Sequence, residues 1–217
     1  MLSVPRDTYI TLKDHEFHKI NSANQAGGYR LAKFAVEKLT KMTIDHMVII
    51  NIRGFIKLFN DMGPFKIFVP NKMSYHDNSA NLHIEIQPGL QEMNGSELVK
   101  YLRFRDSLDG DIGRITRQQI FFRSAMKKFF EPDFVYKIPQ ILINVDGLFK
   151  TDMNFRELVE LGLFFRDADF DSIKTHILPG NFGEDGYWIV NQVKLRSLIS
   201  DITGNEIEIK NSAKSSQ

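Results

Sequence analysis

The sequence predicts an α/β protein, because short runs of β-forming residues alternate with longer segments of helical periodicity. The chain has 217 residues, 42% of them hydrophobic and 25% charged, which is enough to bury the core of one domain or of two small ones. We find no internal repeat, low-complexity segment or flexible linker in it. We therefore expect one α/β domain over residues 1–204 and a polar tail over residues 205–217.

The predicted strands of the first half are short runs of β-branched and aromatic residues. Pro5 ends the first strand, because proline cannot donate a hydrogen bond to a ladder. The apolar run at 46–50 predicts a strand buried on both faces, whereas the alternation at 83–86 predicts an edge strand with one wet face. We expect these strands at 2–4, 9–11, 46–50, 65–69 and 83–86.

Two helices are predicted between these strands, each from apolar residues at three-to-four spacing. The first follows a turn at Gly27 and Gly28, and the second ends at Gly63 and Pro64. Their apolar faces are Leu31, Phe34, Ala35 and Leu39 in the first helix, and Phe55, Leu58, Phe59 and Met62 in the second. We expect a polar loop at 75–78 and a turn at 88–89.

The second half is predicted to be mainly helical, with Asn94 and Asn191 as N-caps. The predicted helical segments are 94–102, a helix from about residue 115, 138–149, 154–165 and a last helix after Asn191. Strands are expected near 173–178 and 187–190. The apolar stripes are Phe122, Ala125, Met126 and Phe129 in the helix from about 115, and Val193, Leu195, Leu198 and Ile202 in the last helix.

The charge balance and the cysteine count restrict the function. Lys and Arg number 28 against 27 Asp and Glu, so a net charge of +1 provides no broad positive field for nucleic acid or an anionic membrane. Any anion site must be local. The absence of cysteine excludes disulfides, thiolate metal sites and a cysteine nucleophile. We expect neither a membrane span nor a signal peptide within these residues.

The densest polar cluster lies at 103–119, where arginines and aspartates precede an apolar helix. If 103–105 is extended, Arg103 and Arg105 project to one side while Phe104 faces the core. If a helix begins near residue 113, Arg114 and Gln118 share a face beside the unpaired N–H groups of its first turn.

Such a cluster suits an anion. Guanidinium groups bind phosphate oxygens bidentately and a helix N-terminus adds backbone donors, so a diphosphate fits better than a carboxylate. The alternative is that the arginines pair with Asp106, Asp109 and Asp111 on a solvated turn. Spacing alone leaves both interpretations open.

Other candidates are weaker. Arg6 follows a strand end, where α/β sheets place ligands, and Lys19 could add an ammonium group to the same site. The histidines at 46, 76, 83 and 176 fit no standard ligand spacing, so no metal site is predicted from them. The turn at Gly27 and Gly28 lacks the Lys-Ser/Thr of a Walker motif and the spaced glycines of a dinucleotide turn.

Several segments of residues 2–190 resemble the LytR-CpsA-Psr (LCP) family of bacterial cell-envelope proteins. The block at 103–119, with Gly113-Arg114-Ile115-x-Arg117-Gln118-Gln119, is the most specific of them. The others are 3–9, 19–21, 27–28, 45–48, 76–78 and 88–91. The sequence departs from the usual family pattern at 63–65 and 93–95.

The resemblance implies a three-layer α/β/α sandwich with a mixed central sheet and a hydrophobic tunnel for a lipid tail. It implies a phosphotransferase that moves a teichoic acid or capsular polymer from a polyprenyl diphosphate carrier to a peptidoglycan hydroxyl. The partners would be that lipid-linked glycopolymer and peptidoglycan, with membrane association through the lipid. The location would be the extracytoplasmic face of the bacterial membrane.

The resemblance also implies roles for individual residues. Asp111, Arg105 and Arg114 would be catalytic, with Asp111 orienting or deprotonating the acceptor hydroxyl. The diphosphate would be held by Arg6, Lys19, Arg103, Arg105, Arg114 and Gln118. Complete family members also carry a cytoplasmic tail, a transmembrane helix and magnesium-binding aspartates before the segment that resembles 3–7. We therefore expect Mg²⁺ in a complete member, with its aspartate ligands outside this chain, which would be an N-terminally truncated LCP domain.

Two other functions use the same residues. One is non-catalytic binding of a lipid diphosphate or an anionic polymer, as in an inactive remnant. The other is hydrolysis of polyprenyl diphosphate, with water in place of the sugar hydroxyl. Product analysis separates hydrolysis from transfer.

Overall fold

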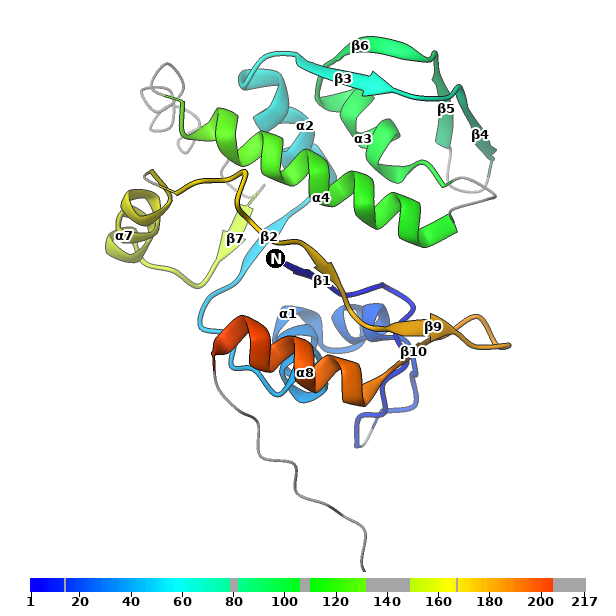
Figure 1. Cartoon of the computed structure of the whole chain (residues 1–217), viewed down its shortest axis with the longest axis vertical. Coiled ribbons are helices and arrows are strands. Elements are labelled where there is room, and N and C mark those ends of the chain that lie inside the picture. Colours follow the sequence, from blue (N-terminus) through cyan, green and yellow to red (C-terminus); the bar gives the residue numbers. More distant parts are fainter. Residues whose placement is uncertain (14, 79–81, 106–109, 132–148, 167, 205–217) are drawn as a thin grey trace, which may run out of the picture. The chain divides into compact units, whose positions relative to one another are not determined.

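The computed structural model describes residues 1–13, 15–78, 82–105, 110–131, 149–166 and 168–204 (Figure 1). The chain divides into two compact units. The larger unit consists of Met1 and residues 45–176, and the smaller unit consists of residues 2–44 and the chain from 177 onward.

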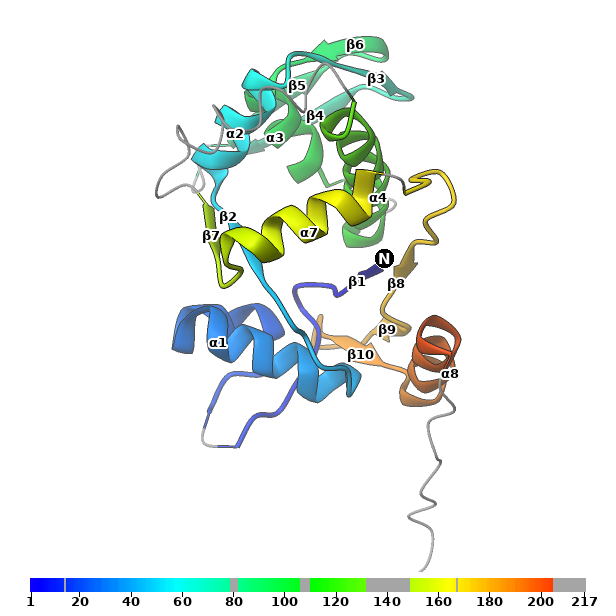
Figure 2. The same ribbon diagram turned by 90° about the vertical axis from the view of Figure 1, so that its left-hand side faces the viewer.

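The larger unit is built around α3, which contacts α2, α4, β5 and β6 (Figures 1 and 2). Short strands and amphipathic helices follow one another along most of this unit, as the sequence pattern predicts. Its elements are β2 (Val48–Ile50), α2 (Ile52–Asp61), β3 (Phe65–Val69), β4 (Met73–Asp77), β5 (Leu82–Ile86), β6 (Gly89–Met93), α3 (Gly95–Arg103), α4 (Gly110–Phe129), β7 (Phe149–Thr151) and α7 (Phe155–Arg166).

Three phenylalanine rings form the centre of the core of the larger unit. The ring of Phe121 lies 5.1 Å from that of Phe59 and 5.3 Å from that of Phe65, between centroids. Around them pack Met62, Met93, Leu98, Leu102 and Phe104. The predicted stripe of α4 was wrong at one position, because Phe122 is 50% exposed and its neighbour Phe121 enters the core.

The smaller unit joins the first part of the chain to the last. Trp188 N–H donates to the carbonyl of Asp7 at 2.9 Å, and Tyr9 N–H donates to the carbonyl of Trp188 at 2.9 Å. The helices α1 and α8 are in contact. The elements are β1 (Leu2–Ser3), α1 (Ile20–Thr40), β9 (Gly180–Phe182), β10 (Trp188–Val190) and α8 (Gln192–Thr203). The boundary between the two units along the sequence falls within β8 (His176–Ile177).

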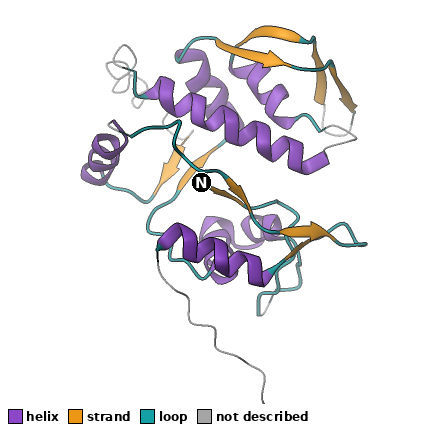
Figure 3. Cartoon of the chain, in the orientation of Figure 1, coloured by secondary structure: helices purple, strands orange, loops and turns teal. Residues whose placement is uncertain are grey.

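The chain is an α/β protein, as the sequence predicts (Figure 3). Within the described ranges the strands pair two by two, and four of these pairs, β2–β7, β3–β6, β4–β5 and β9–β10, are antiparallel. In the fifth pair, β1–β8, the N–H groups of His176 and Leu178 donate to the carbonyls of Met1 and Ser3. Because these bonds advance along both strands in the same direction, the two strands are parallel, and the strand pairing is mixed.

Local capping signals locate several helices correctly. The side chain of Asn94 accepts from the N–H of Glu97, whose carboxylate accepts from the N–H of Asn94, so α3 begins with a capping box. Asn191 accepts from the N–H of Lys194 at 3.0 Å and caps α8.

Among the helices of the described residues, we find none that combines the length and the apolar composition of a membrane crossing.

Two predicted helix starts were wrong. Helix α1 begins at Ile20, and Gly27 and Gly28 are a kink inside it with non-helical backbone angles. Helix α4 begins at Gly110, several residues before the predicted start. Two predicted apolar faces were also only partly correct, since Phe34 of α1 and Val193 of α8 are exposed.

The strand predictions differ from the structure in three ways. The run at 9–11 forms no strand but only a single bridge between Tyr9 and Lys19. The predicted polar loop at 75–78 is mostly strand β4, and β6, β7 and β9 were not predicted. Val48 and Ile50 of β2 are exposed, so this strand is not buried on both faces. Of the predicted amphipathic segment at 138–149, residues 138–148 lie outside the described residues, and Phe149 begins strand β7. The tail at 205–217 also lies outside the described residues.

Candidate functional site

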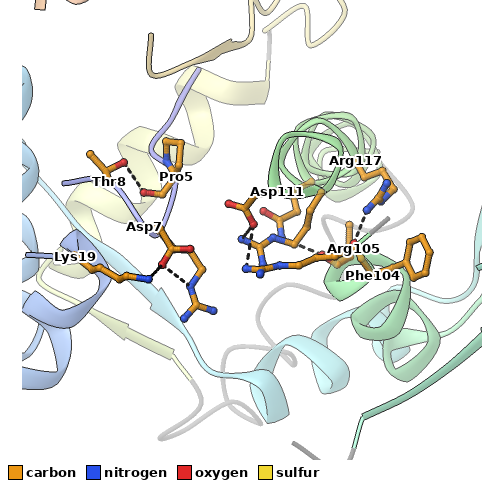
Figure 4. Close-up of polar contacts among 12 residues, drawn as sticks. Pro5, Asp7, Thr8, Lys19, Phe104, Arg105, Asp111 and Arg117 are labelled. Carbon is orange, nitrogen blue, oxygen red and sulfur yellow. Dashed lines mark hydrogen bonds and ion pairs between the residues drawn. The ribbon is translucent and has the colours of Figure 1, made fainter. Parts of the chain in front are cut away.

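Asp111 lies in the first turn of α4 between two arginines. Its Oδ1 is 3.1 Å from Nη2 of Arg105 and also contacts Nη2 of Arg114, three residues further along the helix (Figure 4). The side chain of Asp111 is only 6% exposed, that of Arg114 is 14% exposed and that of Arg105 is 41% exposed. We call Arg105, Asp111 and Arg114 the arginine triad. The carboxylate of the triad is buried, whereas the guanidinium of Arg105 is partly exposed to solvent.

The end of α3 positions Arg105. Arg103 is the last residue of this helix, and Phe104 leaves it with extended backbone angles, φ −57° and ψ 134°. The ring of Phe104 is buried, while Arg103 and Arg105 are exposed on either side of it. The prediction that Phe104 faces the core is confirmed, although Arg103 belongs to a helix and not to an extended segment.

Side chains of α4 hold the end of α3 in place. Arg117 donates to the carbonyl of Phe104, and its guanidinium carbon lies 5.5 Å from the centroid of the Phe104 ring (Figure 4). Gln118 Nε2 donates to the carbonyl of Leu102 at 3.0 Å. These bonds hold in place the backbone of Leu102 and Phe104, which precedes Arg105. The role of Arg117 was not foreseen, because its target is a carbonyl that no sequence motif marks.

Further along α4, two more side chains bind backbone carbonyls. Gln119 Nε2 donates to the carbonyl of His176 at 2.9 Å, and Arg123 Nη2 donates to that of Ile173 at 2.8 Å. Helix α4 therefore anchors both the segment before it and a segment far beyond it in the sequence.

A second basic cluster lies in the smaller unit. Lys19 Nζ is 3.0 Å from Oδ1 of Asp7, and Nε of Arg6 is 3.8 Å from the same oxygen (Figure 4). We call these three residues the lysine cluster. Thr8 is fully buried, and its hydroxyl donates to the carbonyl of Pro5 at 2.6 Å, which fixes the turn that carries Arg6 and Asp7.

The lysine cluster lies at the start of α1, but the first N–H groups of this helix are already bonded. Ile20 N–H donates to the carbonyl of Thr8 at 2.9 Å, and Asn21 N–H donates to the carbonyl of Arg6 at 3.2 Å. Anion binding here would therefore depend on the side chains of Arg6 and Lys19.

Each cluster has more cations than anions. Two guanidinium groups face one carboxylate in the arginine triad, and an ammonium and a guanidinium face one carboxylate in the lysine cluster. Each cluster therefore carries one net positive charge. A phosphate group is attracted to such a charge, and the guanidinium of Arg105, partly exposed, offers paired donors.

The described residues do not fit a magnesium ion. Among them we find no group of three histidine, aspartate or glutamate side chains close enough to hold a metal. Asp111 and Asp7 each face two cations, which oppose a third positive charge at the same oxygens. Mg²⁺ stays a prediction for a complete family member.

Five of the predicted site residues fall into two groups that the fold assembles separately, while Arg103 ends α3 and Gln118 donates to the carbonyl of Leu102. Arg105, Asp111 and Arg114 meet in the larger unit, whereas Arg6 and Lys19 meet at Asp7 in the smaller unit. The interpretation that the arginines pair with aspartates holds for Asp111, but this carboxylate is buried and not on a solvated turn. Asp106 and Asp109 lie outside the described residues.

Known proteins with similar sequences include a regulatory protein and a teichoic acid transferase. Over 179 residues the chain is 28% identical to the regulatory protein MsrR of Staphylococcus aureus, covering 82% of this chain and 54% of MsrR. Over 189 residues it is 30% identical to TagU of Enterococcus faecalis, named polyisoprenyl-teichoic acid–peptidoglycan teichoic acid transferase, covering 86% of this chain and 60% of TagU. The chain thus spans little more than half the length of these relatives.

The fold is that of solved structures with similar sequences. The crystal structure of TagV from B. subtilis superimposes with a TM-score of 0.75 at 24% identity, covering 92% of this chain and 81% of TagV. The model of the LytR_cpsA_psr family matches residues 1–213. The match extends over both units and includes the arginine triad and the lysine cluster. The chain therefore belongs to the LytR_cpsA_psr family.

Proposed function

We propose that the chain is the diphosphate-binding part of a transferase that attaches a polyprenyl-diphosphate-linked glycopolymer, of teichoic acid or capsular type, to peptidoglycan. The proposal rests on one observation, the arginine triad, in which a buried carboxylate holds two guanidinium groups with one net positive charge. Membership of the family and the similarity to TagU, a teichoic acid transferase, support this choice of substrate. The reaction would take place at the extracytoplasmic face of the membrane, where the lipid carrier is presented.

In this reaction a sugar hydroxyl of peptidoglycan attacks the phosphorus that carries the glycopolymer. The new oxygen–phosphorus bond completes a phosphodiester, and the bond to the second phosphate breaks to release polyprenyl phosphate. Arg105 and Arg114 would neutralise the negative charge that develops on the bridging oxygen as it leaves with polyprenyl phosphate. Preorganised cations are effective here because they need not rearrange during the reaction.

Asp111 has two proposed tasks. Its contacts with Arg105 and Arg114 fix the direction of both guanidinium groups. It is also our candidate for orienting the acceptor hydroxyl or receiving its proton. The remaining predicted ligands of the diphosphate are Arg6, Lys19, Arg103 and Gln118.

The binding step is tested with the full chain and geranylgeranyl diphosphate as the probe, by isothermal titration calorimetry. Arg105→Ala and Arg114→Ala should each weaken binding by about tenfold to a hundredfold, since a charged hydrogen bond contributes about 1.5–3 kcal/mol. Arg156→Ala is the matched control, because Arg156 is an exposed arginine of α7 that pairs with Glu160. Unchanged affinity in both variants would show that the arginine triad does not bind the diphosphate.

The reaction itself is tested with a lipid-linked teichoic acid precursor and peptidoglycan. Transfer yields a phosphodiester on the peptidoglycan sugar, hydrolysis yields a free phosphorylated glycopolymer, and a binding protein leaves the precursor intact. Only the first product supports the proposal. Alanine variants of Arg6, Lys19, Arg103 and Gln118, assayed in the same way, test each of these ligands separately.

A further inference from the structure

The antiparallel pair β4–β5 places two histidines directly opposite each other. His76 pairs with His83 in the register, and the centroids of their rings are 3.7 Å apart with an angle of 78° between the ring planes. Both residues are exposed. They are seven positions apart in the sequence, a separation at which only the hairpin register brings them together.

The opposite face of the hairpin is fixed in the core. Met73 and Ile84 are buried in the larger unit, and α3 packs on β5. Because side chains alternate along a strand, His76 and His83 stand on the outer face of a backbone that packing holds in place. The separation of the two imidazoles is therefore set by the register, while each ring can rotate about its own bonds.

The charges around the pair include a carboxylate on the same outer face. Glu85 is two residues from His83 along β5, and it accepts from the hydroxyl of Ser74. The Glu85 carboxylate therefore lies beside the two imidazoles on the outer face of the hairpin. Lys72 Nζ, 3.3 Å from the Glu85 carboxylate, offsets part of its charge.

We propose that His76 and His83 form a binding site for a divalent transition-metal ion, with Zn²⁺ and Cu²⁺ as the best matches. Imidazole nitrogens are favoured ligands of these ions, at about 2.0–2.1 Å for Zn²⁺. Two opposed imidazoles can chelate one ion, and water fills the other positions. Magnesium prefers oxygen ligands, so this site is distinct from any magnesium site of the family.

The bound ion links β4 to β5 across the outer face. With two protein ligands and open positions, the site resembles neither a closed structural zinc site nor the three-ligand catalytic sites. Its affinity should therefore be lower than that of either class. The linkage stabilises the folded hairpin by an amount that grows with the logarithm of the metal concentration above the dissociation constant, because only the folded register brings the two ligands together.

The first test is a titration of the full chain with Zn²⁺, followed by competition with a chromophoric chelator. One equivalent of Zn²⁺ should bind, and His76→Gln and His83→Gln should each lower the affinity by about tenfold or more, because a chelate needs both nitrogens. The double variant should bind at least as weakly as either single variant, because it keeps neither imidazole nitrogen. His18→Gln is the control, since His18 stacks on Tyr9 in the smaller unit, and it should bind as the wild type does.

The second test identifies the ligands directly. Cu²⁺ added to the full chain should show electron paramagnetic resonance coupling to two nitrogen nuclei, and this coupling should fall to one nucleus or disappear in either variant. Circular dichroism without metal verifies that the variants fold. Absence of Zn²⁺ binding, or binding and nitrogen coupling that persist in the double variant, would overturn the proposal.

Discussion

Gly95 lies directly against the backbone carbonyl of Ile56. A Cβ atom at position 95 would be 2.3 Å from that carbonyl oxygen, well inside van der Waals contact. The N–H of Gly95 also donates to Oδ1 of Asn60 at 2.8 Å. The close packing of α2 on α3 therefore depends on the absence of a side chain at this position.

Gly95→Ala should lower the free energy of unfolding by about 1–3 kcal/mol, the usual cost of overpacking, because neither backbone can move away freely. Gly162→Ala in α7 is the matched comparison, since its Cβ would meet nothing within 4 Å. That variant should be stabilised by up to about 1 kcal/mol through helix propensity. Urea unfolding measures both changes, and equal signs for the two would contradict the packing argument.

Asp111→Asn should destabilise the chain by about 3 kcal/mol, because it leaves two arginine groups facing a neutral amide in a mostly buried site. The exposed pair of Lys57 and Asp61 provides the control, with a distance of 3.4 Å between Nζ and Oδ2. Asp61→Asn should cost at most about 0.5 kcal/mol. If denaturant unfolding gave similar losses of free energy for the two variants, burial of the triad would add nothing to its contribution to stability.

Phe121→Ala should cost about 3–5 kcal/mol, because the ring fills the centre of the core of the larger unit. Phe122→Ala, next to it on the exposed side of α4, should change stability by less than about 1 kcal/mol. Thermal and urea unfolding of this pair of variants should rank them clearly. The reverse ranking would mean that α4 is rotated about its axis so that Phe122, and not Phe121, faces the core.

Tyr101 should make stability sensitive to alkaline pH. Burial raises the pKa of its hydroxyl above the ordinary value of 10.0, so the unfolded chain releases this proton first. The stabilisation is complete below pH 10 and is lost as the pH rises through the higher pKa of the folded state. Tyr101→Phe should therefore show a shallower loss of unfolding free energy above pH 10 than the wild type, and parallel curves would refute the assignment.

The parts of the fold that the sequence predicted well depend on local interactions. Asn94 and Asn191 cap helices through bonds to N–H groups two or three residues away, so a short sequence window contains the whole signal. Strand β7 has three residues and owes its existence to its partner β2, which lies far from it in the sequence. Phe121 and Phe122 are identical residues next to each other in the sequence, and periodicity alone could not predict which of them is buried.

In the candidate site, too, the contacts between residues close in the sequence were predictable and those between distant residues were not. Arg105, Asp111 and Arg114 lie within ten residues of one another, and their spacing already suggested an ion-pair cluster. The pairing of Asp7 with Lys19 needs the turn at Thr8, and the pairing of His76 with His83 needs the register of a hairpin. Rules of ligand spacing contain no information about either feature.

The bonds from α4 to backbone carbonyls have a consequence for how the sequence can vary. Every amino acid has a carbonyl group, so the residues at 102, 104, 173 and 176 can be replaced without losing the acceptor, provided that their backbone stays in place. The donors cannot move, because inserting or deleting one residue near the start of α4 turns the rest of the helix by about 100°. Such a change would misdirect at once the four donors Arg117, Gln118, Gln119 and Arg123. The bonds from α4 thus place no demand on the side chains of the segments they anchor, but they do require that α4 keep its length.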